Sequence, residues 1–149
     1  MKYTIGADFG GSSSKMTLLD EDGRVIVTTS YEYPTCYPQN GWAEQKPEDW
    51  WKAFVFNTRK IFAKSGISPE DVVAVSLDAA THTAVLLDQN DCPVRKAIYW
   101  TDARSSREAA ELQETSGDEI TRLSFNSVSS IWTLPQLLWL SRHEPESLA

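Results

Sequence analysis

Residues 5–15 read Ile-Gly-Ala-Asp-Phe-Gly-Gly-Ser-Ser-Ser-Lys, an apolar strand that runs into a turn of glycines and serines. The strand itself spans residues 3–8, and residues 15–20 have the pattern of its hairpin partner. A second turn, containing Gly23, leads into a β-branched strand over residues 25–31. The sequence therefore predicts that the chain opens with a meander of three antiparallel strands.

The turn after the first strand has the composition of an anion-binding loop. Gly10 and Gly11 allow backbone conformations in which several N–H groups point toward one oxyanion. The next residues add three hydroxyl donors and one cation, namely Ser12, Ser13, Ser14 and Lys15. Asp8, at the strand end, suits Mg²⁺, which prefers carboxylate, phosphate and water oxygens. No helix follows at once, so this is not a GxxxxGK[ST] loop, and an ordinary glycine-serine hairpin is the alternative.

Beyond the meander, the pattern changes to helices and strands in alternation. Residues 47–64 begin with a proline and two acids and carry apolar residues at helical spacing, which predicts a helix that Gly66 ends. Residues 72–77 form a continuous apolar run, which predicts a strand buried on both faces. Shorter strands are expected at residues 83–87 and 96–100, and helices at 102–116, ending at Gly117, and at 133–142.

These elements predict an α/β protein with a ribonuclease H-like fold. Its mixed sheet would open with the antiparallel meander and would be flanked by helices. The same plan underlies the actin, hexokinase and sugar-kinase group of ATPases, in which the first hairpin binds phosphate. This fold class therefore agrees with the anion-binding composition of the first turn.

Composition limits the partners and the location. The 149 residues carry 21 acidic and 14 basic side chains, and the basic ones form no cluster. Because nucleic acid and anionic membranes bind clustered Lys and Arg, neither is expected as a partner. No apolar run has the length of a secretory signal or a membrane span. Cys36 and Cys92 lie far apart without metal-like spacing, which favours reduced thiols in a cytoplasmic protein.

Four further segments resemble the FGGY family of carbohydrate kinases and occur in that family's order. Residues 41–51, Gly-Trp-Ala-Glu-Gln-Lys-Pro-Glu-Asp-Trp-Trp, are similar to its glycine-aromatic-x-Glu-Gln-x-Pro-x-x-Trp segment. Residues 75–88 match a strand, substrate loop and strand that read Ser-Gly-Gln-Met-His-Gly in xylulose kinases. Residues 97–104 contain the family's Trp-x-Asp-x-Arg, and residues 134–140 resemble its Pro-Lys-Leu-Leu-Trp-Leu helix. With the first hairpin, the resemblance spans residues 5–146.

The resemblance implies a kinase that uses ATP and Mg²⁺ to phosphorylate a sugar or polyol of ketopentose or pentitol type. Asp8 would serve the metal, and residues 10–15 would bind the phosphates. Two residues would contact sugar hydroxyls and two would form further parts of the pocket wall: Thr81 and His82, then Trp100 and Asp102. A polyhydroxylated ligand needs such hydrogen-bonding groups beside an aromatic face.

Structural interpretations of these residues stay open. His82 could be a hydrogen-bonded loop histidine, and Asp102 could cap the helix that it begins. Glu44 is expected to fix its loop, and three tryptophans are expected to pack in the core or along a helix, namely Trp42, Trp50 and Trp51.

The substrate loop departs from the xylulose kinase pattern. Residues 78–81 read Asp-Ala-Ala-Thr in place of Ser-Gly-Gln-Met, so a neighbouring ketose, a pentitol or a tetritol is as well supported as xylulose. Asp78 has no role in the family pattern.

Members of the family are several times longer, and their general base and adenosine-binding domain come later in the chain. We therefore expect residues 1–149 to be part of the N-terminal kinase domain, without the C-terminal nucleotide-binding domain, and to be inactive alone. A homodimer is compatible with this interpretation. Two rivals are a non-catalytic sugar-binding module and a two-metal nuclease with Asp8 and Asp78 as ligands, although the nuclease would not need the glycine-serine hairpin.

Overall fold

A computed structural model describes residues 1–148 of the chain. They fall into two compact units, and each is treated by itself. The sheet unit comprises Met1–Thr35 and Glu48–Ala80, and the helical unit comprises Cys36–Pro47 and Thr81–Ala149.

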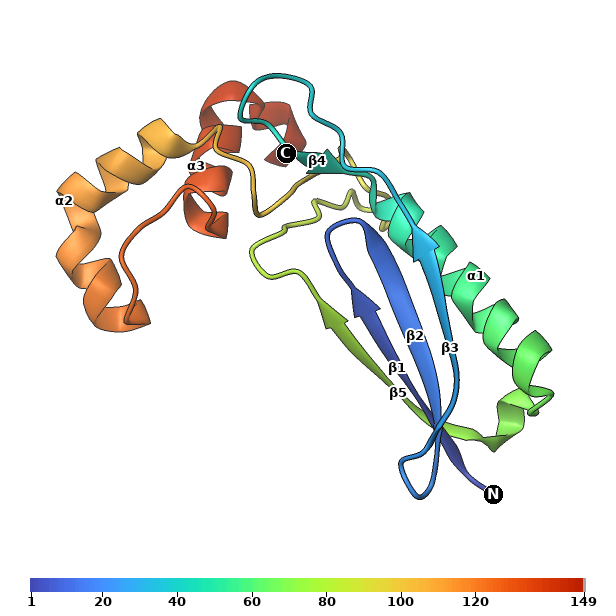
Figure 1. Ribbon diagram of the computed structural model, residues 1–149. Coiled ribbons are helices and arrows are strands. Elements are labelled where there is room, and N and C mark those ends of the chain that lie inside the picture. The colour runs from blue at the N-terminus through green and yellow to red at the C-terminus, as the bar shows by residue number, and fades with distance from the viewer. Residues whose placement is uncertain (149) are drawn as a thin grey trace. The chain divides into compact units, whose positions relative to one another are not determined.

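A four-stranded mixed sheet forms the centre of the sheet unit (Figure 1). Its strands are β1 (Tyr3–Phe9), β2 (Ser13–Asp20), β3 (Val25–Glu32) and β5 (Val72–Ala79), in the order β3-β2-β1-β5. The first three pair antiparallel, and β5 pairs parallel with β1. The predicted meander and the mixed sheet are therefore confirmed.

Helix α1 (Pro47–Ser65) covers one face of this sheet. The period-two alternation of β2 turns Met16 and Leu18 toward the helix, where both are fully buried with Ile61. Trp51 of α1 is 66% exposed but stacks on Phe54, with ring centroids 5.6 Å apart. The helix ends as predicted, because Gly66 adopts a left-handed conformation (φ 69°) and donates its N–H to the carbonyl of Phe62.

Strand β5 corrects one prediction. The run of apolar residues indicated burial on both faces, but Val73, Val75 and Leu77 are 57%, 50% and 65% exposed. Within residues 1–148, β5 is the edge of the sheet and pairs only with β1. Within residues 1–148, the apolar run therefore forms the predicted strand without being buried on both faces.

The helical unit is built around a two-stranded ribbon and two helices. Strand β4 (Glu44–Gln45) pairs antiparallel with β6 (Ala97–Ile98), and the helices are α2 (Ser106–Ser124) and α3 (Thr133–His143). Short 3-10 turns occur at Pro69–Asp71 in the sheet unit and at Pro145–Leu148 in this one. One hydrophobic cluster of the helical unit is formed by Ile98, Trp139 and Leu140, with Trp42, Leu86 and Leu137 packed against them.

Three boundaries in the helical unit were wrongly predicted. Residues 83–87 form no strand, and only a single bridge joins Leu87 to Pro93. The expected strand over residues 96–100 is reduced to the two residues of β6. Helix α2 begins at Ser106 and runs through Gly117 to Ser124, because a glycine inside a helix costs only about 1 kcal/mol. Among residues 1–148, no helix is both long and apolar enough to cross a membrane.

Truncating a leucine under α1 should destabilise the sheet unit strongly. Leu18→Ala removes a fully buried side chain, so we expect a loss of about 2–5 kcal/mol in the free energy of unfolding. Leu77→Ala, at a 65% exposed position of the same sheet, is the matched control and should cost less than about 1 kcal/mol. Urea unfolding of both variants measures the difference, and equal losses would contradict the assignment of the core.

Candidate functional site

The turn between β1 and β2 is held from one side by hydrogen bonds to its carbonyl groups. The Tyr33 hydroxyl donates to the carbonyls of Gly10 (2.7 Å) and Ser13 (3.1 Å), and the Tyr33 N–H donates to that of Ser12 (2.9 Å). Thr35 donates its hydroxyl to the carbonyl of Gly11 at 3.2 Å. The conformation of the turn is therefore fixed by the chain itself. Nothing in the local sequence pattern indicated Tyr33, which lies just beyond β3.

The three serines of the turn do not share one environment. Ser14 is completely buried, and its Oγ accepts a hydrogen bond of 2.7 Å from the side chain of Asn57 in α1. Lys15 is exposed and, by the alternation of β2, lies on the opposite face of the sheet. The Ser14 side chain thus anchors the hairpin to the helix, whereas Ser12 is exposed and Ser13 is half-buried.

A shallow cavity of about 270 Å³ lies on the sheet face that carries Lys15. Its lining residues come from three neighbouring strands: Gly6, Ala7, Asp8, Lys15, Thr17, Ser76 and Asp78. In the strand registers, Asp8 is the partner of Lys15 on one side and of Asp78 on the other. Both carboxylates stand near the carboxyl ends of the parallel pair β1 and β5, where ligands of α/β proteins bind.

The donor set of this cavity fits Mg²⁺ together with an anion. Among residues 1–148, no three His, Cys, Asp or Glu side chains converge as a metal site. Mg²⁺ is commonly held by one or two carboxylates plus phosphate and water oxygens, so Asp8 with Asp78 beside it suffices. The parallel register places Asp78 beside Asp8 at the ends of neighbouring strands, the arrangement that the nuclease alternative assumed for this pair.

In the helical unit, Thr81 and His82 form a tight exposed turn. His82 has a left-handed backbone (φ 52°), and its ring stacks on Trp132 with centroids 5.1 Å apart and planes inclined by 15°. The carbonyl of Thr81 accepts a hydrogen bond of 3.2 Å from the Thr83 hydroxyl. Within residues 1–148, the contact of the His82 imidazole is this stack, and the ring makes no hydrogen bond.

A second turn follows in the chain and is closed by a carboxylate. The backbone N–H groups of Cys92 and Asn90 donate to Asp88 Oδ1, at 2.9 Å and 2.8 Å. These bonds stabilise the ionised form and hold the pKa of Asp88 below its usual value. Asp88 is therefore a turn-forming residue.

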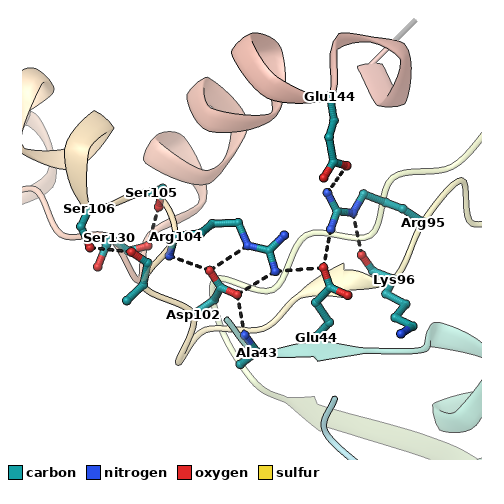
Figure 2. Close-up of polar contacts among 11 residues, drawn as sticks. Ala43, Glu44, Arg95, Lys96, Asp102, Arg104, Ser105, Ser106, Ser130 and Glu144 are labelled. Atoms are coloured by element: carbon teal, nitrogen blue, oxygen red, sulfur yellow. Dashed lines mark hydrogen bonds and ion pairs between the residues drawn. The ribbon is translucent and has the colours of Figure 1, made fainter. Parts of the chain in front are cut away.

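Trp100 and Asp102, the two residues expected in the pocket wall, have opposite environments. Trp100 is 41% exposed and offers an aromatic surface. Asp102 is 1% exposed, and its Oδ2 accepts the N–H of Ala43 at 2.6 Å (Figure 2). Both Asp102 oxygens also accept bonds from the Arg104 guanidinium, at 2.9 Å from Nε and 2.8 Å from Nη2. Asp102 does not cap α2, which begins four residues later.

Asp102 belongs to a buried ionic network that joins four segments of the helical unit (Figure 2). Arg104 Nη2 lies 2.9 Å from Glu44 Oε1, which also accepts a bond of 2.7 Å from Arg95. Arg95 in turn pairs with Glu144, just after α3. The network fixes the segment of β4, which confirms the structural role expected for Glu44.

Arg104 is also enclosed by aromatic rings. Its guanidinium carbon lies 3.7 Å from the ring centroid of Trp42 and 5.2 Å from that of Trp139, so the cation stacks on indole faces. The Trp42 and Trp139 rings meet edge to face at 5.4 Å. The ionic network therefore packs directly against the apolar cluster of the helical unit, to which Trp42 and Trp139 belong.

Comparison with known proteins identifies the fold and the family of the chain. The fold is that of the sugar kinases, as in xylulose kinase from Rhodospirillum rubrum, with a TM-score of 0.89 and 26% identity over 98% of this chain and 30% of that one. The FGGY family of carbohydrate kinases, N-terminal domain, matches residues 3–149. The chain belongs to this family.

Curated relatives of the chain include two kinds of kinase. The xylulose kinase of Bacillus subtilis is 36% identical over 146 residues, which cover 98% of this chain and 29% of the relative. The glycerol kinase of Paracidovorax citrulli is 32% identical over 151 residues, covering 100% and 30%. The chain thus spans about three tenths of the length of these relatives.

Proposed function

We propose that this chain is the part of an ATP-dependent carbohydrate kinase that binds the sugar or polyol and the terminal phosphates of ATP. The observation that carries the proposal is the cavity at the β1–β2 hairpin, where Asp8 stands between Lys15 and Asp78. Relatives named xylulose kinase and glycerol kinase support the reaction class. The family membership removes the support for a nuclease.

The hairpin would act as a preformed phosphate cradle. Tyr33 and Thr35 hold the carbonyls of the turn, so its conformation needs little reorganisation when an anion arrives. Lys15 and the hydroxyls of Ser12 and Ser13 would contact phosphate oxygens, whereas the Ser14 hydroxyl is engaged with Asn57. Asp8 would hold Mg²⁺ directly or through water, and bound Mg²⁺ neutralises charge on the transferred phosphate.

Thr81, His82 and Trp100 would bind the carbohydrate. The Thr81 hydroxyl and the imidazole nitrogens of His82 are exposed hydrogen-bonding groups, and Trp100 supplies an apolar surface for the C–H groups of a sugar. Asp102 would act indirectly, by holding Arg104 and the backbone of Ala43. The general base and the adenosine site would lie outside residues 1–149.

Calorimetry with D-xylulose, xylitol, erythritol and glycerol tests the sugar site in the chain as it stands. We expect at least one of these ligands to bind, and His82→Ala to weaken that binding roughly 2- to 10-fold, because a lost hydrogen bond to a ligand hydroxyl costs about 0.5–1.5 kcal/mol. His143→Ala is the matched control, since its Nδ1 already lies 2.9 Å from the Trp139 carbonyl. Equal affinity of the His82→Ala variant and the unmodified chain would contradict the assignment.

A further inference from the structure

The backbone of His82 is held in a conformation that its own residue type does not favour. Its φ of 52° lies in the left-handed region, which L-residues other than glycine rarely occupy. Such a conformation persists only where the surroundings determine it, and it is found preferentially at ligand sites.

Trp132 is the side chain that contacts the His82 ring. The two rings are nearly parallel, at 15°, with their centroids 5.1 Å apart, which is a favourable stacked geometry. No motif in the sequence singled out Trp132. Since the imidazole has no hydrogen bond within residues 1–148, this stack is what orients it.

The backbone of Trp132 is held by hydrogen bonds. Trp132 directly precedes α3, and its backbone N–H donates to the carbonyl of Ser129 at 3.1 Å. The neighbouring carbonyl of Ser130 accepts a bond of 3.0 Å from the Ser105 hydroxyl, and Ser105 is completely buried at the start of α2 (Figure 2). Trp132 is thus connected to the beginnings of both helices.

We propose that Trp132 is a positioning residue of the sugar site. Its indole covers one face of the His82 imidazole and fixes the plane of the ring, so that the edge with both nitrogens is held in position for a ligand hydroxyl. This inference rests on the proposed function, because it takes His82 as the sugar contact. It extends that function to a residue outside every motif of the chain.

The two histidines of the chain allow an internal comparison. His143 also stacks on a tryptophan, with its ring 4.7 Å from that of Trp139, but its Nδ1 is occupied by the Trp139 carbonyl. Both histidines are exposed, so the ring protons of both can be followed by NMR in one sample. Only His82 combines a stacked face with unbonded nitrogens among residues 1–148.

The test is the variant Trp132→Leu, with Trp132→Phe as the conservative variant. Loss of the indole ring current should move the ring protons of His82 downfield, while those of His143 stay in place and report that the helical unit is folded. Among D-xylulose, xylitol, erythritol and glycerol, the ligand that the unmodified chain binds most tightly should lose affinity roughly 2- to 10-fold, the equivalent of one aromatic pair. Trp132→Phe should restore most of that affinity.

Two results would overturn the proposal: unchanged His82 signals in Trp132→Leu, or displaced signals with an unchanged affinity for that same ligand. A third result would contradict the proposed function without deciding the role of Trp132. If neither D-xylulose, xylitol nor glycerol perturbs His82 in the unmodified chain, the sugar site is wrong. The orienting role of Trp132 is then decided by the ring signals alone.

Discussion

Arg104→Ala should lower the free energy of unfolding of the helical unit by about 3–5 kcal/mol, the usual cost of removing one partner from a buried ion pair. The side chains of Arg104 and Asp102 are 1% and 0% exposed, and that of Glu44 is 10% exposed. Without the guanidinium, two carboxylates keep their burial and lose the cation between them. The face of Trp42 loses its stacked partner as well. Thermal or urea unfolding measures the loss.

Two further variants test whether the loss of stability comes from the buried network and not from the removal of any arginine side chain. Arg24→Ala breaks an exposed pair with Asp22, whose side chains are 76% and 62% exposed, and should cost at most about 1 kcal/mol. Arg104→Lys keeps the charge but loses the planar fork that contacts both carboxylates, so its stability should be intermediate. A loss at Arg104→Ala no larger than at Arg24→Ala would show that the network is not stabilising.

Asp8→Asn should reduce turnover about 100- to 1000-fold in a kinase polypeptide in which residues 1–149 are followed by the C-terminal domain. Removing one preorganised electrostatic group from a reaction centre usually costs this much turnover. Asn keeps the size of the side chain but removes the negative charge that would hold Mg²⁺ beside the phosphates. Sugar-dependent release of ADP is the measurement.

The matched control for this variant is Asp118→Asn, on the exposed surface of α2. Its turnover should equal that of the unmodified kinase. An Asp8→Asn variant that retains full turnover at limiting Mg²⁺ would contradict the role of the hairpin. The variant Asp78→Asn tests whether the second carboxylate of the cavity also contributes to metal binding.

Much of the sheet unit could be predicted because its signals are local. The alternation in β2, the glycines of the first turn and the proline and acids that begin α1 are each contained in a few consecutive residues. The phosphate-binding role proposed for the first turn was inferred from the same local composition. The side chains that hold the turn could not be inferred in this way, because Tyr33 and Asn57 contact it across separations of 20 to 43 residues.

The arrangement of the helical unit could not be predicted from local patterns. Arg95 contacts Glu44 and Glu144 across separations of 51 and 49 residues, and neither contact has a sequence signature. Asp102 followed a family motif, but the motif did not reveal that the carboxylate is buried.

The central claim is that the first hairpin binds the terminal phosphates of ATP, and NMR of the isotope-labelled chain tests it most directly. On titration with Mg²⁺ and ATP, the amide signals of residues 10–15 should shift, and the shifts should require Mg²⁺ and disappear in Asp8→Asn. The account is contradicted if those amides stay unchanged while the titration perturbs signals elsewhere, or if the hairpin responds equally in Asp8→Asn.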